Sequence, residues 1–153
     1  MYINLYSFRL IGSILQAHKI PLLPALLDLF IFLIFKSKVP FSAKIGKGTY
    51  FSHRGIAVVF HPKAVVGERC VIGTCVTLGG RGKKVPGAPV IGNDVYIGTG
   101  AKILGPVRVG DGATIGANAV VISDVPAGAT AVGVPARVIE TDSEGKVVRE
   151  SFE

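Results

Sequence analysis

A chain of 153 residues, 49% of them hydrophobic, is long enough for one domain with a core and too short for two ordinary domains. The net charge of +7 arises entirely before Glu68, where eight Lys or Arg residues face one acid, Asp28. From Glu68 onward, nine basic residues meet nine acidic ones. Neither a nucleic-acid-binding motif nor a row of stacking aromatic residues accompanies this charge, so we expect no nucleic-acid partner.

The first element in chain order is an apolar N-terminal segment, residues 1–38. We expect two short helices in it, at about residues 3–17 and 22–36. His18 precedes a Lys-Ile-Pro turn between these helices, which favours a structural role for it. The segment has no basic start followed by a small-residue cleavage site, so a secretory signal is not expected and the protein is expected in the cytoplasm.

The apolar run Ile20–Phe35 leaves two interpretations open. It is shorter than the roughly 18 residues of a membrane-spanning helix, and Pro24 and Asp28 interrupt it. One interpretation is that the helices pack on the rest of the protein or on a sister subunit. The other is peripheral association of residues 1–38 with the inner face of the cytoplasmic membrane, with three basic residues at anionic headgroups: Lys19, Lys36 and Lys38.

An aliphatic residue recurs at every sixth position in the second half of the chain: Ile91, Ile97, Ile103, Val109, Ile115 and Val121. Four residues after each comes a small or β-branched one: Val95, Ala101, Val107, Ala113, Ala119 and Val125. This period fits neither an α-helix nor an alternating strand, and it is typical of hexapeptide β-helices. About three hexads close one triangular coil, so the sequence predicts a parallel β-helix over residues 39–139. A C-terminal tail, 140–153, follows; its order stays open, and its composition suggests a flexible end.

Two breaks interrupt the count of six. Upstream the frame has Val39, Ile45 and Phe51, then three extra residues before Phe60, after which it continues through Val66, Ile72 and Leu78. The second break falls between Leu78 and Ile91, where the sequence is GGRGKKVPGAP. Insertions in a solenoid become loops on one face, often the binding face. The first break carries two of the three histidines, His53 and His61.

Three stretches carry a resemblance to a known family: SHRGIAVVFHPKAVVGERCVIGTCVTLGG, IGTGAKILGPVRVGDGATIGANAVV and GVPARVI. Over residues 36–139 the chain resembles the hexapeptide-repeat acyltransferases, in particular the serine acetyltransferase-like branch. That branch includes colanic acid acetyltransferases and other O-acetyltransferases of surface polysaccharides. The resemblance implies an all-β, left-handed parallel β-helix preceded by a short helical segment, a homotrimer with sites between subunits, and acetyl-CoA as the acyl donor.

The resemblance also implies roles for individual residues. The family's catalytic histidine matches His53, and its glycine that contacts acetyl-CoA matches Gly80. Cofactor contacts are expected from Gly79, Gly80, Arg81, Lys83, Lys84, Lys102 and Arg137. His61 precedes Pro62 at a hexad corner, which favours a turn residue outside the catalytic set. No metal is expected.

The sequence departs from the serine acetyltransferase pattern at several points. Those enzymes carry Asp directly before the catalytic histidine, where this chain has Ser52, and a second Asp that aligns with Lys38. They also carry an Arg-His pair in the loop after Leu-Gly-Gly, where residues 79–90 contain only Arg81 for that role. The long helical domain that precedes their β-helix has no counterpart here. These departures favour an acceptor other than L-serine.

Acetyl transfer to an alcohol needs a base with a pKa near neutrality, which histidine supplies. His53 is expected to be that base, oriented by a backbone carbonyl or by the next subunit. The Gly79–Gly80 backbone is a candidate for stabilising the oxyanion, and the basic residues Arg81, Lys83, Lys84 and Lys102 could neutralise phosphates. A covalent route through Cys75 is disfavoured because no base lies at an activating spacing; both cysteines are expected to be reduced and partly buried.

Three functions follow from the sequence. The first is an acetyl-CoA-dependent O-acetyltransferase that acts directly on a sugar hydroxyl in capsule, exopolysaccharide or envelope-glycan synthesis. The second keeps the chemistry and changes the acceptor to L-serine. The third is a trimeric β-helix that acts as a scaffold without catalysis. Activity that depends on His53 would exclude this third function.

Overall fold

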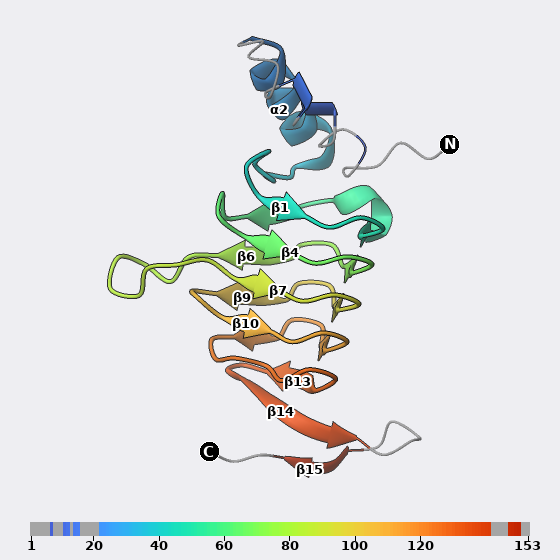
Figure 1. Cartoon of the computed structure of the whole chain (residues 1–153), viewed down its shortest axis with the longest axis vertical. Coiled ribbons are helices and arrows are strands. Elements are labelled where there is room, and N and C mark those ends of the chain that lie inside the picture. Colours follow the sequence, from blue (N-terminus) through green and yellow to red (C-terminus); the bar gives the residue numbers. More distant parts are fainter. Residues whose placement is uncertain (1–6, 8–10, 13, 16–21, 142–146, 151–153) are drawn as a thin grey trace.

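The computed structural model describes residues 7, 11–12, 14–15, 22–141 and 147–150 (Figure 1). Helix α2 spans Leu22–Phe35 and confirms the second predicted helix. Of the first predicted helix, residues 7, 11–12 and 14–15 are helical, and the remainder, like His18, lies outside the described residues. Below α2 the chain winds into stacked coils of short strands (Figure 1).

The strands form three parallel faces, with one strand from each coil on each face. The first face has β1 (Lys44–Ile45), β4 (Val65–Val66), β7 (Val90–Ile91) and β10 (Arg108–Val109). The second begins with β2 (Tyr50–Phe51), β5 (Val71–Ile72), β8 (Tyr96–Ile97), β11 (Thr114–Ile115) and β13 (Thr130–Gly133). The third has β3 (Val59–Phe60), β6 (Thr77–Gly79), β9 (Lys102–Leu104) and β12 (Val120–Val121). This architecture confirms the predicted left-handed parallel β-helix.

The repeat of six places the same kind of side chain at the same place in every coil. Parallel pairing aligns Ile72 with Ile97 and Ile97 with Ile115, so identical positions stack inside. Every aliphatic and small residue of the two predicted sets from Ile91 to Val125 is buried, with at most 4% of its surface exposed. The core is therefore a stack of aliphatic layers, which explains why the chain needs so few aromatic residues.

Glycine after the aliphatic position permits close stacking of the corners. A Cβ on Gly98 would lie 2.6 Å from the backbone nitrogen of Ala117, and one on Gly73 would lie 2.5 Å from that of Thr99. Real side chains do not approach backbone so closely, and the coil below cannot move away without breaking the strand pairing. These corners need glycine because of space.

The C-terminal end closes the solenoid with antiparallel strands. β14 (Ala136–Thr141) pairs with β13, and β15 (Val147–Glu150) pairs with β14. The expectation of a flexible tail from residue 140 is wrong for these residues, because β14 continues to Thr141 and β15 forms a further strand. Sequence alone missed this end because the pairing turns antiparallel after β13 and leaves the period of six.

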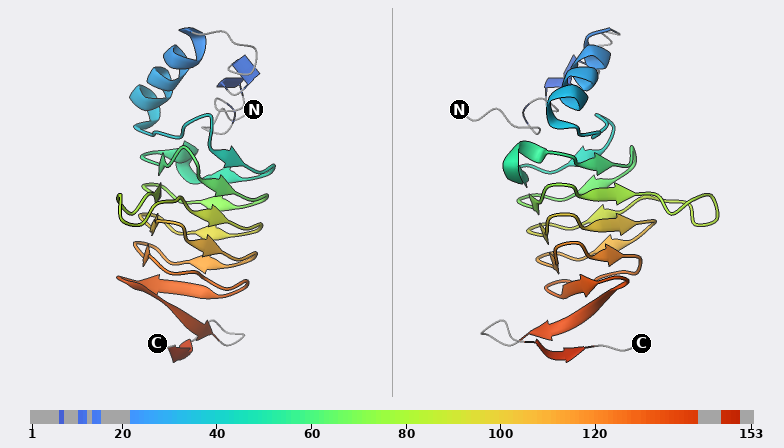
Figure 2. Two further views of the ribbon diagram at one scale, coloured as in Figure 1. Left: turned by 60° about the vertical axis from the view of Figure 1, so that its left-hand side comes forward. Right: turned by 180° about the vertical axis from the view of Figure 1, so that it is seen from behind.

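Helix α2 lies on the N-terminal end of the solenoid and buries one side there (Figure 2). Ile31 and Phe35 are 1% and 5% exposed and belong to the core cluster. Asp28, which interrupts the apolar run, forms an ion pair with Lys38. The other side of the helix is apolar and exposed, with 45–59% of each of these residues accessible: Leu26, Leu29, Phe30, Phe32, Leu33 and Ile34. No helix among the described residues is long and apolar enough to span a bilayer.

Both breaks in the repeat form segments that project from corners of the coils. The first forms a short helical turn, η1 (Ser52–Gly55), between β2 and β3. The second forms the loop of residues 80–89, between β6 and β7. The turn precedes β3 and the loop follows β6, so the two lie at different corners of the solenoid, at the two ends of the third face (Figures 1 and 2).

Candidate active site

The η1 turn holds His53 in an unusual backbone conformation. His53, Arg54 and Gly55 have φ values of 48°, 66° and 81°, so three successive residues lie in the left-handed region. Nowhere else in the described chain do two consecutive non-glycine residues have positive φ. Such a conformation costs free energy for residues other than glycine and is typical of functional positions.

The Ser37 hydroxyl anchors the end of the turn. Ser37 is fully buried, and its Oγ accepts a hydrogen bond from the Val58 N–H at 3.0 Å. The same oxygen lies within hydrogen-bonding distance of the carbonyls of Gly55 and Phe35. Ser37 thus ties the end of η1 to the segment that follows α2. Sequence reasoning missed this residue because its partners are backbone atoms 18 and 21 positions away along the chain.

The His53 side chain is exposed at this corner. Among the described residues, no side chain or carbonyl makes a hydrogen bond with its ring. Ser52 precedes it where a carboxylate would be expected from the family pattern, and it is only half-buried. Within one chain the imidazole can therefore accept a proton from an incoming hydroxyl, but nothing described here orients it.

The second break begins at the end of β6. The Gly79 carbonyl accepts a hydrogen bond from the Gly105 N–H at 2.9 Å, which fixes the start of the loop against the next coil. The following Gly80 is exposed, and its N–H has no hydrogen-bond partner in the part of the chain that the structure describes. Gly80 thus has a backbone donor that is available to a ligand.

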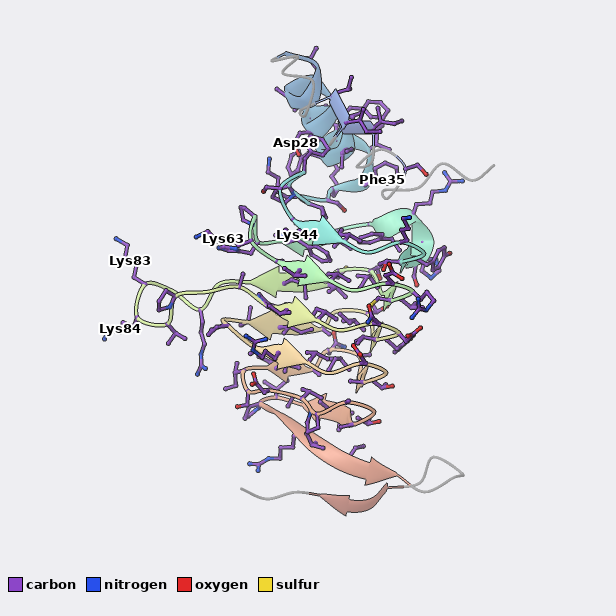
Figure 3. The ribbon with its side chains drawn as sticks, viewed as in Figure 1. Asp28, Phe35, Lys44, Lys63, Lys83 and Lys84 are labelled. Carbon is purple, nitrogen blue, oxygen red and sulfur yellow. The ribbon has the colours of Figure 1, made fainter. Side chains whose placement is uncertain are left out.

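The predicted basic residues of the loop divide into two groups. Arg81 folds back along the corner, where its Nη1 donates to the Ile122 carbonyl at 3.2 Å and its side chain covers Gly105. Lys83 and Lys84 lie at the tip of the loop and point away from the body (Figure 3). Lys63 projects from the same side of the molecule (Figure 3).

The remaining two predicted cofactor contacts lie away from the loop tip. Lys102 is on β9, and its Nζ donates to the Gly100 carbonyl at 2.7 Å. Arg137 is on β14 and, together with Ser123 and Asp124, lines an open hollow of about 240 Å³ at the C-terminal end. The structure therefore brings Gly79, Gly80 and Arg81 together at one corner and places Arg137 at the end of the solenoid.

The cysteines and the acidic residues offer no further catalytic group. Both cysteines are free, with Cys70 buried and Cys75 exposed. The expectation that both are partly buried is thus wrong for Cys75, which sits at a corner with a φ of 57°. Burial raises the pKa of the Cys70 thiol. The described residues contain no group of three or more His, Cys, Asp or Glu that could hold a metal ion.

Comparison with known proteins identifies similar sequences and structures. Residues 88–123 match the family model described as bacterial transferase hexapeptide (six repeats). These residues carry the hexapeptide repeat of that transferase family. It is 37% identical over 150 residues to a serine acetyltransferase of Synechococcus elongatus, across 88% of this chain and 61% of that protein. It is 50% identical over 101 residues to one of Helicobacter pylori, across 65% of this chain and 58% of that protein.

Solved structures of serine acetyltransferases are similar to this chain. A truncated apoenzyme has a TM-score of 0.82 at 38% identity, covering 91% of this chain and 59% of that one. A complex with CoA has a TM-score of 0.79 at 37% identity, covering 88% and 55%. A Neisseria gonorrhoeae enzyme in complex with serine has a TM-score of 0.80 at 34% identity, covering 88% and 55%. The chain thus spans little more than half the length of these relatives.

Proposed function

We propose that this protein is an acetyl-CoA-dependent O-acetyltransferase in which His53 is the general base. The observation that carries this is the His53 turn: an exposed imidazole, held in a strained conformation by buried Ser37, at a break in a hexapeptide transferase fold. The relatives named above support acetyl transfer, and the one solved with CoA supports acetyl-CoA as donor.

The proposed reaction is direct. The imidazole of His53 removes the proton of the acceptor hydroxyl as its oxygen attacks the thioester carbonyl. The negative charge that develops on the carbonyl oxygen is stabilised by the Gly80 N–H, which has no partner among the described residues. The carbon–sulfur bond then breaks, the acetyl ester is released, and the thiolate of CoA takes up the proton from His53. No acyl-enzyme forms, and exposed Cys75 takes no part.

We propose further that the site is completed between subunits of a homotrimer. Within one chain, the η1 turn that holds His53 precedes β3 and the loop of residues 80–89 follows β6, so the two lie at different corners of the solenoid (Figure 1). One subunit would therefore supply His53 and its neighbour the donor loop. Tyr50 and Tyr96 are 53% and 51% exposed on the outer side of one face, where a neighbouring subunit could cover them.

Mixing two inactive variants tests the shared site. His53→Asn removes the base while keeping a side chain that tolerates positive φ. Subunits with His53→Asn are mixed, through unfolding and refolding, with subunits in which Gly80→Val blocks the loop. Activity that returns in the mixture, but in neither variant refolded alone, supports a site between subunits. Failure of the mixture to regain activity, with trimers formed, contradicts it.

The acceptor is where the expectation from sequence changes most. The relatives are serine acetyltransferases, so they support L-serine more strongly than the sugar hydroxyl that the sequence favours. The structure adds that Lys38, at the position of a family carboxylate, is paired with Asp28. A serine-binding site in this protein must then use other groups, for example from a neighbouring subunit.

Release of CoA thiol from acetyl-CoA distinguishes the acceptors. The wild-type protein is assayed with L-serine and, separately, with a panel of sugars and glycan oligomers. Turnover with L-serine supports the acceptor that the relatives indicate, whereas turnover with a sugar alone supports glycan acetylation. Absence of turnover with every acceptor, together with absence of CoA binding by calorimetry, contradicts the enzyme and supports a scaffold.

We also propose that the apolar side of α2 rests on an anionic membrane surface at the inner face of the cytoplasmic membrane. The exposed side chains of α2 form one continuous apolar side, and positive charge in the described residues is concentrated in the adjoining first coil. Lys36, Lys44 and Lys47 are exposed there. Apolar insertion and attraction to anionic headgroups together give stable binding where either alone is marginal.

A further inference from the structure

His61 lies at the corner directly beside the start of the donor loop. It follows β3, whereas Gly80 follows β6, and β3 and β6 are paired neighbours in one sheet. The His61 N–H donates to the Leu78 carbonyl at 2.6 Å, so the backbone at the two corners is joined. The histidine that the sequence assigns to a turn is therefore adjacent to the glycine that is expected to contact the acyl donor.

The hydrogen bond at one ring nitrogen of His61 determines the state of the other. The Nδ1 atom accepts a hydrogen bond from the Lys63 N–H at 3.1 Å. In a neutral imidazole one nitrogen is an acceptor and the other a donor, so the proton lies on Nε2. This Nε2–H has no hydrogen-bond partner in the part of the chain that is described.

The ring of His61 lies near Gly80 and Gly87, with room for a small group beside Gly80. A methyl group built on Gly80 would lie 3.7 Å from His61 Cδ2, 4.0 Å from its Nε2 and 3.8 Å from the Gly87 carbonyl oxygen. These are ordinary van der Waals distances, so the space accommodates a small group without any shift. His61 is half-buried, which restricts its ring more than that of an exposed side chain.

Two hydrogen-bond donors without partners among the described residues, the Gly80 N–H and the His61 Nε2–H, thus lie at neighbouring corners of the same face. We propose that His61 is a binding residue for the acyl donor and donates a hydrogen bond from Nε2 to a carbonyl oxygen of acetyl-CoA. This inference rests on the proposed function. It gives His61 a second role besides its turn, because Nδ1 serves the corner and Nε2 serves the ligand.

The row of corners below His61 suits an extended ligand. Gly80, Gly105 and Ile122 follow the third-face strands of successive coils, and Arg81 runs along them to the Ile122 carbonyl. Coils are about 4.8 Å apart, so the row from His61 to Ile122 extends about 14 Å. Acetyl-CoA is a long chain with a thioester and two amide carbonyls, and His61 stands at the end of this row nearest the N-terminus.

Two substitutions separate the roles of the two ring nitrogens. His61→Asn keeps an acceptor that can receive the Lys63 N–H, as asparagine does in turns, and removes the donor at the Nε2 position. His61→Gln places an amide N–H near the Nε2 position and removes the acceptor for Lys63. If His61 serves only the turn, His61→Gln should lower the melting temperature and His61→Asn should not. If His61 binds the ligand, His61→Asn should weaken the affinity for the acyl donor and His61→Gln should not.

The measurement is CoA and acetyl-CoA affinity by calorimetry, with KM and kcat for acetyl-CoA and a thermal melt for each variant. We expect His61→Asn to melt like wild type. It should weaken the affinity for the acyl donor, or lower kcat, by about three- to tenfold, because that is the effect of losing one hydrogen bond. We expect His61→Gln to retain most of the affinity. Weaker binding of CoA itself assigns the bond to an amide carbonyl, and a lower kcat with unchanged CoA affinity assigns it to the thioester.

Two outcomes contradict the proposal in different ways. If wild type binds CoA and His61→Asn has unchanged affinity, KM and kcat, His61 is only a turn residue and the proposed function stands. If wild type binds neither CoA nor acetyl-CoA, the proposed function fails and this inference fails with it. Gly80→Ala supplies a second test, since its methyl group enters the same space without backbone strain and should weaken donor binding while the melt is unchanged.

Discussion

The Oγ of Ser37 accepts a hydrogen bond from the Val58 N–H at 3.0 Å, which joins the segment after α2 to the segment after the His53 turn. Both residues are fully buried. Water cannot replace the bond there, so the geometry of the turn depends on a hydroxyl that lies outside the repeat.

Ser37→Ala should therefore lower the free energy of unfolding by about 1–3 kcal/mol, because it leaves the buried Val58 N–H without a partner. It should also lower kcat, since η1 loses its anchor. Chemical denaturation and an acetyl-CoA assay measure the two effects. The matched control is Ser42→Ala, which removes an exposed hydroxyl bonded to the Pro62 carbonyl and should change little. Equal stability of the two variants would contradict the anchoring role.

The pair of Arg69 and Asp94 predicts a pH-dependent contribution to stability. Arg69 donates from Nε and Nη2 to the Asp94 carboxylate, each at 2.8 Å, and these bonds lower the pKa of Asp94. A lowered pKa means that the contribution is present above the unfolded-state value of about 3.9 and is lost as the pH falls through the folded-state value. Asp94→Asn should therefore lower the melting temperature slightly at pH 7 and not at pH 2. The same difference at both pH values would refute the assignment.

The two cysteines should differ in their reaction with a thiol reagent. Cys75 is exposed, whereas Cys70 is buried with a raised pKa and its Sγ lies 3.1 Å from the Gly92 carbonyl oxygen. One thiol should therefore be modified rapidly in the native protein and the second only on unfolding. Cys75→Ala should abolish the rapid phase and retain acetyl transfer. Loss of activity in Cys75→Ala with the oligomer intact would instead favour an acyl-cysteine intermediate.

Flotation with liposomes tests the proposed membrane surface. The protein should float with vesicles that contain anionic lipid and remain at the bottom with vesicles of zwitterionic lipid alone. Replacing Leu29 and Leu33, one turn apart and 52% and 53% exposed, by Ser should abolish flotation. The control is Val134→Ser, which removes a more exposed apolar side chain at the other end of the solenoid. A wild-type protein that never floats would refute membrane binding and leave packing between subunits.

The sequence predicts the solenoid well because its core is periodic. Each residue from Ile91 to Val121 in the repeat contributes the same contacts as the one above it, so spacing alone identifies the buried positions. The breaks likewise predict the His53 turn and the loop of residues 80–89. Long-range contacts at the corners cannot be predicted from the spacing. The contact of Ser37 with the His53 turn and the position of His61 beside Gly80 both depend on which coil stacks on which. The lengths of the insertions determine that stacking.

The most direct measurement is release of CoA thiol from acetyl-CoA in the presence of the acceptor that the panel identifies, for wild type beside His53→Asn. General base catalysis contributes about 10²–10⁴-fold, so the variant should lose at least 100-fold in kcat while it keeps its fold, its oligomeric state and its CoA affinity. A His53→Asn protein that turns over like wild type would contradict the assignment of His53 as the base.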